Sequence, residues 1–491
     1  MNTEKSMITN RSFKEILENQ GRESEKCEDR PIVCVQGLGF VGSAMAVATS
    51  IAKSDSLELN FNVIGIDLDT KLGNERIDAI NQGRFPFNTN DELLKKSIKD
   101  AYSQHNLIAT SDVSAFSLAD IIVIDIHLDI DFFDDKPILN FSTLEIAIES
   151  VASHVKKGAL IIVETTVPPG TCEKVIIPKL EEILCKRNLS LDDIFLAHSY
   201  ERVMPGDDYL DSIINFWRVF SGMNKESADL CEEFLSKIIN IDQFPLTRLS
   251  SMTASETAKV LENTYRAVNI AFIDEWTKYA ELVGIDIYEV IDAIRKRPTH
   301  SNMMYPGLGV GGYCLTKDSS FAPAALEQVF GHKGKDFPFS NLSRKTNNYM
   351  PMHAFSHTLR VFDGDIKKKR ILILGASYRQ DVGDTRFSPS EIYVNECLNH
   401  GAHVEYFDPH VEFWPELNIS SISEPINFKS YDLLLIAVSH SKLKEFDYNL
   451  LDINPSLIII DAINLLATAG SSKDKYGDRL IILGNGQKNY E

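Results

Sequence analysis

Short runs of apolar residues alternate with amphipathic stretches over the first half of the chain. The predicted strands are 31–36, 61–67, 120–124, 160–163 and 195–198, and the predicted helices are 43–53, 90–103, 142–155 and 173–187. The strands are apolar along almost their whole length, so both of their faces should be buried. Strands of this kind that alternate with helices predict a parallel sheet covered by helices on both sides.

The pattern changes after residue 225 and changes back near residue 366. Residues 250–284 have helical periodicity and end at Gly284, a suitable C-terminal cap, which predicts one long helix or two stacked ones. Buried-type strands return at 371–374, 403–408, 433–438 and 457–460. The predicted fold is α/β, with two Rossmann-like α/β domains joined by a central helical domain that contains a long helix. The predicted parts are a polar N-terminal extension at 1–30, a first α/β domain at 31–225, the helical domain at 226–365 and a second α/β domain at 366–491.

Composition narrows the class of protein. The 491 residues include 50 basic and 70 acidic side chains, a net charge of −20, which argues against nucleic acids and anionic membranes as main partners. No apolar run approaches the roughly 20 residues of a membrane span, and the charged first thirty residues do not have the pattern of a secretory signal. The seven cysteines are scattered, without C-x-x-C pairs. We therefore expect a cytoplasmic protein with no disulfide framework and no structural zinc site.

A glycine-rich turn lies between the first predicted strand and helix. Gly37-Leu38-Gly39-Phe40-Val41-Gly42 matches the G-x-G-x-x-G fingerprint, in which glycines let the backbone approach a pyrophosphate at a helix N-terminus. Asp67 ends the next strand and should accept hydrogen bonds from the adenosine ribose, with Asp69 as a weaker alternative. A carboxylate at this position repels a 2′-phosphate, so the pattern favours NAD over NADP. The alternative is a glycine turn that serves packing only.

Two polar segments follow predicted strands at the edge where parallel sheets bind ligands. Thr165 and Thr166 begin Thr-Thr-Val-Pro-Pro-Gly, although Thr and Pro are also ordinary turn residues. Glu201 and Arg202 follow His198-Ser-Tyr, where an acid beside a base indicates either a site or a surface pair.

The most unusual segment is Gly307 to Asp318, with the sequence GLGVGGYCLTKD. Its glycines Gly309, Gly311 and Gly312 can bring backbone amides close to a ligand. Cys314 lies near Lys317 and is a candidate thiolate nucleophile, although a single cysteine is more often a small buried hydrophobe. Lys259 and Asn263 are four residues apart and share one helix face, which could also be an ordinary solvated face.

These features together favour one kind of chemistry. A nicotinamide-dependent enzyme that only oxidises an alcohol needs an acid or base, whereas one that continues from aldehyde to acid needs a nucleophile. A dinucleotide fingerprint, a candidate thiolate and a second α/β domain favour the second kind.

The chain resembles the UDP-glucose/GDP-mannose dehydrogenase family of nucleotide-sugar dehydrogenases from about residue 31 to 465. The shared motifs are GLGFVG, VIGID, TTVPPG, ER..PG at 201–206, the Lys259/Asn263 helix, GVGGYCLTKD, GDTR at 383–386 and FDP at 407–409. The resemblance implies four-electron oxidation of a sugar C6 alcohol to a uronic acid with two NAD⁺, for polysaccharide biosynthesis, and a homodimer built on the central helix.

The resemblance also implies roles by position. Cys314 is the expected nucleophile, Lys259 stabilises oxyanion character on the C6 oxygen, and Asp318 is the acid/base helper that orders water. Thr166 and Glu201 hold catalytic water and the sugar. The expected cofactor-binding residues are those of the glycine-rich turn, Asp67 and also Thr165. The expected substrate contacts also include Asn263, the backbone of 309–312, Arg202 and Arg379, and Arg386 is expected near the cofactor phosphates.

The chain departs from the family pattern at three places. Ile126-His-Leu-Asp129 replaces V-x-T-P and removes a cofactor-side threonine, Ser199-Tyr-Glu201 replaces S-P-E, and Tyr313 stands where Ser or His is common. Arg202 with Pro205-Gly206 resembles the branch acting on UDP-N-acetylhexosamines, whereas Lys317-Asp318 resembles the UDP-glucose branch. Both sugars therefore remain open at this point. Two rival functions also remain open, a two-electron hydroxyacid-type dehydrogenase and a catalytically silent nucleotide-sugar-binding protein.

Overall fold

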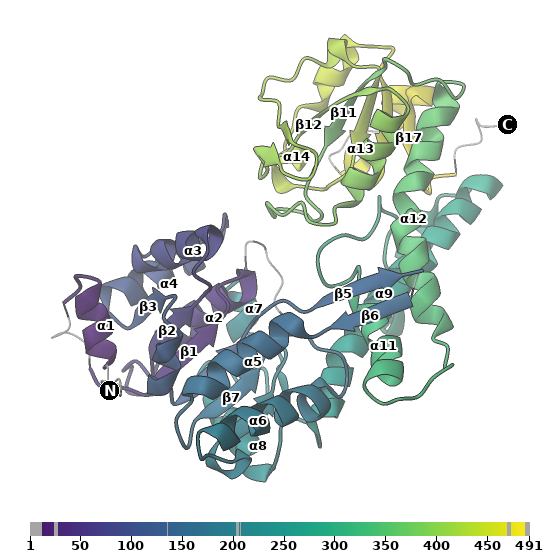
Figure 1. Cartoon of the computed structure of the whole chain (residues 1–491). Coiled ribbons are helices and arrows are strands. Elements are labelled where there is room, and N and C mark those ends of the chain that lie inside the picture. Colours follow the sequence, from purple (N-terminus) through teal and green to yellow (C-terminus); the bar gives the residue numbers. More distant parts are fainter. Residues whose placement is uncertain are drawn as a thin grey trace, which may run out of the picture. The chain divides into compact units, whose positions relative to one another are not determined.

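The computed structural model describes residues 12–23, 28–134, 136–202, 206, 208–468 and 473–486. The chain forms two compact units, Met1–Val260 with Ala324–Lys335, and Leu261–Pro323 with Asp336–Glu491 (Figure 1). Each unit contains one large sheet, as the alternating strand and helix pattern predicts.

The sheet of the first unit has eight strands in the order β10-β9-β8-β7-β4-β1-β2-β3, parallel throughout except between β8 and β9. The strands are β1 (Ile32–Gln36), β2 (Asn62–Ile66), β3 (Leu107–Thr110), β4 (Ile121–Ile124), β7 (Leu160–Val163), β8 (Phe195–His198), β9 (Val219–Gly222) and β10 (Thr247–Arg248). The helices of this unit include α2 (Phe40–Ile51), α3 (Lys71–Asn81), α4 (Glu92–Ser103), α5 (Ser142–His154), α6 (Ile177–Lys186), α7 (Asp211–Ile214) and α8 (Lys225–Ser236). Strands β2 and β3 follow one another on one side of β1, and the chain then crosses over to place β4 on the other side of β1. This reversal creates the crevice where such sheets bind ligands.

The first sheet extends beyond residue 225, where the sequence predicts a domain boundary. Helix α8 packs against β8 and β9, and β10 adds a last strand of two residues. Strands this short leave no hydrophobic run in the sequence, so their membership of the sheet depends on tertiary pairing.

The described part of the N-terminal extension is folded against this sheet. Helix α1 (Phe13–Asn19) begins with a capping box between Ser12 and Glu15, and its Phe13 and Leu17 are buried. Arg22 and Gln20 then donate hydrogen bonds to carbonyl groups of β3, at 2.8 Å to Leu107 and 2.9 Å to Ala109. The segment therefore covers the outer edge of the sheet, an edge that would otherwise offer unpaired backbone groups. The remainder of the predicted extension, 1–11 and 24–27, lies outside the described residues.

An antiparallel hairpin follows β4 at the position of the missing V-x-T-P motif. It consists of β5 (Asp129–Phe133) and β6 (Lys136–Asn140). The sequence analysis did not predict it, because its residues are mostly exposed and give no buried-strand pattern.

Residues 250–284 form one helix, α9 (Met252–Val283), rather than two stacked ones. Gly284 ends it with φ +77°, a backbone conformation that favours glycine, and its N–H bonds to the carbonyl of Ala280 at 2.9 Å. The other central helices are α10 (Ile287–Arg295), α11 (Phe321–Gln328) and α12 (Pro338–Val361).

The second unit contains a five-stranded parallel sheet in the order β12-β11-β15-β16-β17. Its strands are β11 (Arg370–Leu374), β12 (His403–Phe407), β15 (Leu433–Ile436), β16 (Ile458–Asp461) and β17 (Leu480–Ile482). The remaining elements are α13 (Pro389–Asn399), α14 (Ser441–Lys444), α15 (Leu465–Thr468), α16 (Lys473–Tyr476) and the short pair β13 (Phe413–Trp414) and β14 (Ile419–Ser420). Separate hydrophobic clusters cover the two faces of this sheet, as expected for strands that are apolar throughout. Among the described residues, no helix combines the length and apolar character needed to cross a membrane.

Candidate active site

The glycine-rich turn between β1 and α2 has the geometry of a dinucleotide-binding loop. A Cβ atom at Gly37 would lie 2.1 Å from the carbonyl oxygen of Asp125, and one at Gly42 would lie 1.9 Å from that of Gly37. Both positions therefore require glycine for close backbone packing. Gly39 instead faces open space and precedes Phe40, the first residue of α2, whose N-terminus has no side-chain cap. Amide groups at the uncapped N-terminus, next to Val41, suit a pyrophosphate, so these residues fit NAD.

Asp67 is oriented by this loop. Its carboxylate accepts hydrogen bonds from the backbone N–H of Leu38 at 3.2 Å and of Leu68 at 2.8 Å, and it pairs with Arg76 at 3.2 Å. Asp69 instead accepts a hydrogen bond from Asn74 at 2.9 Å. The geometry therefore favours Asp67 over Asp69 as the ribose-binding residue. Arg76, which the sequence analysis did not single out, brings a cation to the same place.

The Thr-Thr-Val-Pro-Pro-Gly segment continues from β7. The Thr165 hydroxyl donates to the carbonyl of Ile124 at 3.1 Å and accepts from the N–H of Ile126 at 2.9 Å, which ties together the ends of β4 and β7. Thr166 is partly exposed beside it. Glu256 of α9 then accepts a hydrogen bond from the N–H of Cys172 at 2.7 Å, which holds the end of the segment.

A group of charged side chains, of which Glu164 and Arg218 are buried and Asp125 is partly buried, lies at the same edge of the first sheet. Asp125 follows β4 and Glu164 follows β7, and Glu164 forms an ion pair with the buried Arg218. Burial raises the pKa of Asp125 well above its ordinary value, and the charges of Glu164 and Glu201 raise it further, against the opposite effect of Arg218. A Cβ atom on Gly42 would lie 3.1 Å from that of Asp125, so this carboxyl group underlies the dinucleotide loop.

Sequence reasoning missed this charged group. Its signal was an acidic residue directly after an apolar strand in two places, at Asp125 and Glu164. Each acidic residue, taken alone, resembles the beginning of a loop, so the sequence analysis did not recognise the two as parts of one group.

Lys259, Glu201 and Arg202 surround Tyr200. The Lys259 ammonium donates to the backbone carbonyl of Glu201 at 2.7 Å and lies 5.4 Å from the centre of the Tyr200 ring. Arg202 donates to the carbonyl of Trp217 at 3.0 Å and to the Tyr200 hydroxyl at 3.1 Å. A carbonyl group and a phenol hydroxyl thus orient the guanidinium of Arg202. Pro205, which belongs to the same motif, lies outside the described residues.

The glycines before Cys314 pack closely against their own unit. A Cβ atom on Gly309 would lie 2.8 Å from Pro389, one on Gly311 2.6 Å from Tyr378, and one on Gly312 2.7 Å from Tyr378. Gly312 also donates from its N–H to the carbonyl of Arg386 at 3.2 Å. The glycines thus allow the loop to lie against residues 378–389. Close packing therefore explains the glycines here, in addition to the close contact with a ligand that the sequence predicts.

Cys314 and Asp318 occupy one turn of this loop. Cys314 is exposed, and its carbonyl accepts a hydrogen bond from the N–H of Asp318 at 2.9 Å. The buried Asp318 carboxylate accepts from Asn263 at 2.7 Å and pairs with Lys317 at 3.1 Å. Lys317 in turn lies 4.3 Å from the ring centres of both Tyr313 and Phe321. The Asn263 bond therefore anchors the cysteine loop to α9, one helical turn after Lys259.

Two of the predicted arginines, Arg379 and Arg386, lie in the second unit. Arg386 forms a bidentate pair with Asp384, at 3.0 and 2.7 Å, and these bonds raise the pKa of its guanidinium. Burial lowers the pKa of Arg266 on α9, and the positive charge of Arg379 lowers it further, so the two cations act on each other electrostatically. Two neighbouring cations suit an anionic group such as a diphosphate. Sequence reasoning missed Arg266, because it was one charged residue on a long helix.

The matches to known protein families occur along the chain in the same order as the parts described above. The chain matches the UDP-glucose/GDP-mannose dehydrogenase family in its NAD binding domain at residues 32–239, its central domain at 253–349 and its UDP binding domain at 372–468. It is 30% identical over 461 residues to the UDP-N-acetyl-D-mannosamine dehydrogenase of Methanocaldococcus jannaschii, covering 93% of this chain and 97% of that protein.

Two solved structures are similar over nearly their whole length. The UDP-D-ManNAc dehydrogenase of Pyrococcus horikoshii has a TM-score of 0.77 and 26% identity, with 93% of this chain and 99% of that chain covered. The NDP-N-acetyl-D-galactosaminuronic acid dehydrogenase of Methanosarcina mazei Go1 has a TM-score of 0.74 and 27% identity, with coverages of 96% and 98%.

Proposed function

The chain belongs to the UDP-glucose/GDP-mannose dehydrogenase family and is an NAD-dependent nucleotide-sugar dehydrogenase, and we propose that its substrate is a UDP-linked N-acetylhexosamine. We propose further that it oxidises the C6 hydroxyl of this sugar to a carboxylate, in the cytoplasm, for polysaccharide biosynthesis. The hydrogen bond of Asn263 to Asp318 carries the proposal, because it holds the loop of Cys314 against helix α9.

Each of the proposed roles follows from the chemistry of the side chain. Bound NAD⁺ would accept a hydride in each of two oxidation steps. The Lys259 ammonium would stabilise negative charge on the C6 oxygen while its proton leaves, and Asp318 would take up protons and order water. Glu201 and Thr166 would hold that water and the sugar.

Cys314 would act in the second half of the reaction. Its thiolate would form a bond to the aldehyde carbon and give a thiohemiacetal, which loses a hydride to become a thioester. Water would then add to the thioester carbonyl, the carbon–sulfur bond would break, and the uronate would leave with the thiolate restored. The exposure of Cys314 supports this role, since a nucleophile must reach its substrate.

Arg202 and the relatives support the N-acetylated sugar. A guanidinium offers several donors to an acetamido carbonyl, and the three relatives described above are named for N-acetylated sugars. Arg379 and Arg266 would receive the diphosphate, with Asn263 and the 309–312 backbone against the sugar.

The test is to count NADH per sugar over a panel of UDP-N-acetylmannosamine, UDP-N-acetylglucosamine, UDP-N-acetylgalactosamine and UDP-glucose. We expect two NADH per molecule of an N-acetylated sugar and a uronate product. One NADH would indicate a two-electron dehydrogenase, and none would indicate a binding protein. Turnover of UDP-glucose that equals or exceeds that of every N-acetylated sugar would contradict the substrate assignment.

Arg202→Ala provides a sharper test of the sugar. Loss of hydrogen bonds from a charged donor costs about 1.5–3 kcal/mol, so kcat/KM for the N-acetylated sugar should fall roughly ten- to a hundredfold. Arg248→Ala is the matched control, because Arg248 pairs with Asp229 at the far strand β10 of the same sheet. An unchanged kcat/KM in Arg202→Ala would remove this residue from the substrate site.

A further inference from the structure

Two groups of three histidine and acidic side chains occur within the described residues, each with ligand atoms no more than 4.8 Å apart: Glu281, His353 and His357, and Asp381, His410 and His440. In the second group, the ring nitrogens of His440 already have protein partners. Nδ1 accepts the N–H of Asp381 at 2.9 Å, and Nε2 lies 3.1 Å from the carboxylate of Asp408. That group is therefore a closed hydrogen-bond network that ties together loops of the second sheet.

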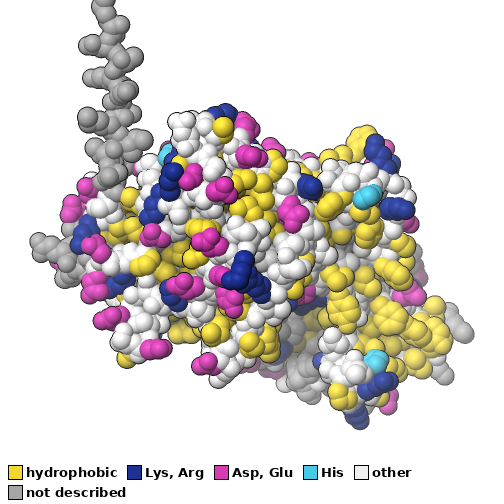
Figure 2. All heavy atoms as spheres, turned by 90° about the horizontal axis from the view of Figure 1, so that it is seen from below, with side chains coloured by type: hydrophobic (Ala, Val, Ile, Leu, Met, Phe, Trp, Pro, Cys, Tyr) yellow, Lys and Arg dark blue, Asp and Glu magenta, His cyan; other side chains and the backbone are white. Residues whose placement is uncertain are grey.

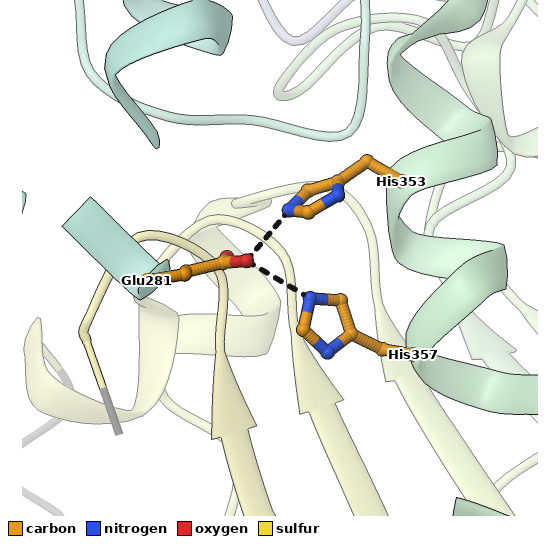
Figure 3. Close-up of side chains that lie close together, drawn as sticks. All are labelled: Glu281, His353 and His357. Atoms are coloured by element: carbon orange, nitrogen blue, oxygen red, sulfur yellow. Dashed lines mark hydrogen bonds and ion pairs between the residues drawn. The ribbon is translucent and has the colours of Figure 1, made fainter. Parts of the chain in front are cut away.

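The first group converges on one oxygen atom. Glu281 comes from the last turn of α9, and His353 and His357 come from consecutive turns of α12, so that all three side chains point toward one another (Figure 3). Oε2 of Glu281 lies 2.8 Å from Nε2 of His353 and 3.1 Å from Nε2 of His357. Residues four apart on a helix share a face, which is why both imidazoles reach the same point.

The surroundings hold this arrangement in place. The exposed fractions of the three side chains are 17% for Glu281, 14% for His353 and 4% for His357. The other carboxylate oxygen of Glu281 accepts the N–H of Gly484 at 2.8 Å, in the turn after β17, which fixes the orientation of the carboxylate. Burial opposes ionisation of Glu281, but the hydrogen bonds from the two histidines outweigh it and lower the pKa of the carboxyl group to about 2. The group is thus a carboxylate with two imidazole nitrogens directed at it.

The geometry points to a binding site for a divalent transition-metal ion of the Zn²⁺ class, with Nε2 of His353, Nε2 of His357 and a carboxylate oxygen of Glu281 as its protein ligands. Two imidazoles four residues apart on one helix, with a carboxylate from another helix, form a donor set that zinc uses, with water in the fourth position. Mg²⁺ and Ca²⁺ prefer all-oxygen sites and are disfavoured here. This proposal departs from the expectation of no structural zinc site, which rested on the scattered cysteines and did not consider histidine and carboxylate ligands.

The site would stabilise the second unit and would not hydrolyse a substrate. The residues between the histidines are Ala354, Phe355 and Ser356, so the general-base glutamate of a hydrolytic H-E-x-x-H helix is missing. A metal bound here would join α9, α12 and, through Glu281, the turn after β17. A metal bound at Nε2 would take the place of the proton that now forms each hydrogen bond, and each neutral imidazole would then carry its proton on Nδ1.

The test is zinc titration of the tag-free full chain by calorimetry, with Co²⁺ as a spectroscopic probe, after dialysis against a chelator. We expect one ion per chain, the absorption bands of tetrahedral Co²⁺, and a rise of Tm with Zn²⁺ but not with Mg²⁺. The titration is repeated with the Cys314→Ser variant, which lacks the exposed thiol and so cannot bind Zn²⁺ there. No binding in that variant, or binding of Mg²⁺ with equal affinity, would overturn the assignment.

Three variants locate the ion. His353→Gln and His357→Gln should each weaken Zn²⁺ binding by more than about a hundredfold, which exceeds the usual effect of losing an outer hydrogen-bond partner. His410→Gln is the matched control from the second group and should bind as the parent chain does. Because a His→Gln change can alter stability even without metal, the decisive quantity is the difference in Tm with and without Zn²⁺. An undiminished difference in His353→Gln and His357→Gln, or its loss in His410→Gln, would place the ion elsewhere and refute the site.

Discussion

Among single residues, Cys314 differs from most other cysteines in its surroundings. Cys34, Cys172, Cys231 and Cys397 are buried, whereas Cys314 and Cys185 are exposed among the described cysteines. Burial raises the pKa of the Cys34, Cys172, Cys231 and Cys397 thiols, which makes them inert packing residues. The glycine-rich loop therefore carries a thiol that solvent can reach.

Cys314→Ala should abolish uronate formation while binding of the nucleotide sugar remains. The thiolate is needed only after the aldehyde has formed, so NADH per sugar should fall from two to one at most. Cys185→Ala is the matched control, since Cys185 is exposed on α6. If Cys314→Ala still released two NADH per sugar, the cysteine would be a packing residue.

Asp125 is a second residue whose role depends on burial. The pKa of its carboxyl group is raised above the ordinary value, so the folded protein holds a proton that the unfolded chain releases near pH 4. The contribution of Asp125 to stability is therefore greatest below that pH and declines as the pH rises through the raised pKa. Because Asp125 underlies the Gly37–Gly42 loop, the affinity for NAD should decline with it.

Asp125→Asn should remove this dependence, because an amide of similar shape does not ionise. We expect the loss of NAD affinity and of unfolding free energy between mildly acidic and alkaline pH to be smaller in Asp125→Asn than in the parent chain. Asp55→Asn, at an exposed position, should behave as the parent does. Parallel pH profiles for Asp125→Asn and the parent would mean that Asp125 does not titrate in this way.

Among the elements, the ends of β11 and β12 and the loop after β15 are joined by one carboxylate. Asp408, after β12, accepts the N–H groups of Ala376 and Ser377 at 2.8 and 3.0 Å, and His440 lies 3.1 Å away. Burial would raise the pKa of Asp408, but these hydrogen bonds and the nearby His440 prevail and lower it. Asp408 thus adds stability that is present above the unfolded pKa of about 4 and is lost as the pH falls through the lowered pKa.

Asp408→Asn should destabilise the second unit by about 1.5–3 kcal/mol at neutral pH, the value of hydrogen bonds to a charged group. The difference from the parent chain should shrink in acid, where the parent also loses the charge. Urea unfolding at several pH values measures both effects. A constant difference at all pH values would show that packing, and not ionisation, is responsible.

At the scale of the whole molecule, helix α9 leaves an apolar face exposed. Leu261, Tyr265, Phe272, Trp276 and Tyr279 follow helical spacing, and each is at least 42% exposed. Figure 2 also shows exposed hydrophobic side chains gathered into continuous areas on one face of the protein. Exposed apolar surface of this kind marks protein–protein contacts, which supports the homodimer expected from the family resemblance.

The double variant Phe272→Glu/Trp276→Glu should therefore halve the mass measured by light scattering, because it buries two charges at the proposed contact. Ile146→Glu is the control, since Ile146 is 66% exposed on α5 in the first unit. An unchanged mass in the double variant would place the dimer contact elsewhere, and a monomeric parent chain would reject the dimer.

The sequence by itself determined the features that depend on local forces. The buried strands, the need for glycine at Gly42 and the end of α9 at Gly284 follow from hydrophobic periodicity and backbone sterics, which act over a few residues. Family motifs added the expected roles of Lys259, Asp318 and Cys314, and these roles stay predictions. The sequence did not predict strand β10, which is short, or the β5–β6 hairpin, which is exposed.

Tertiary structure alone decided which distant side chains meet. Asn263 and Asp318 are 55 residues apart, and Glu281 and His357 are 76 apart, so no local pattern relates them. The same holds for Asp125, Glu164 and Arg218. They come together only because strands β4, β7, β8 and β9 lie side by side in the sheet. The physical reason is that burial and charge act through space: a carboxyl group changes its pKa, or becomes a metal ligand, according to what the folded chain places beside it.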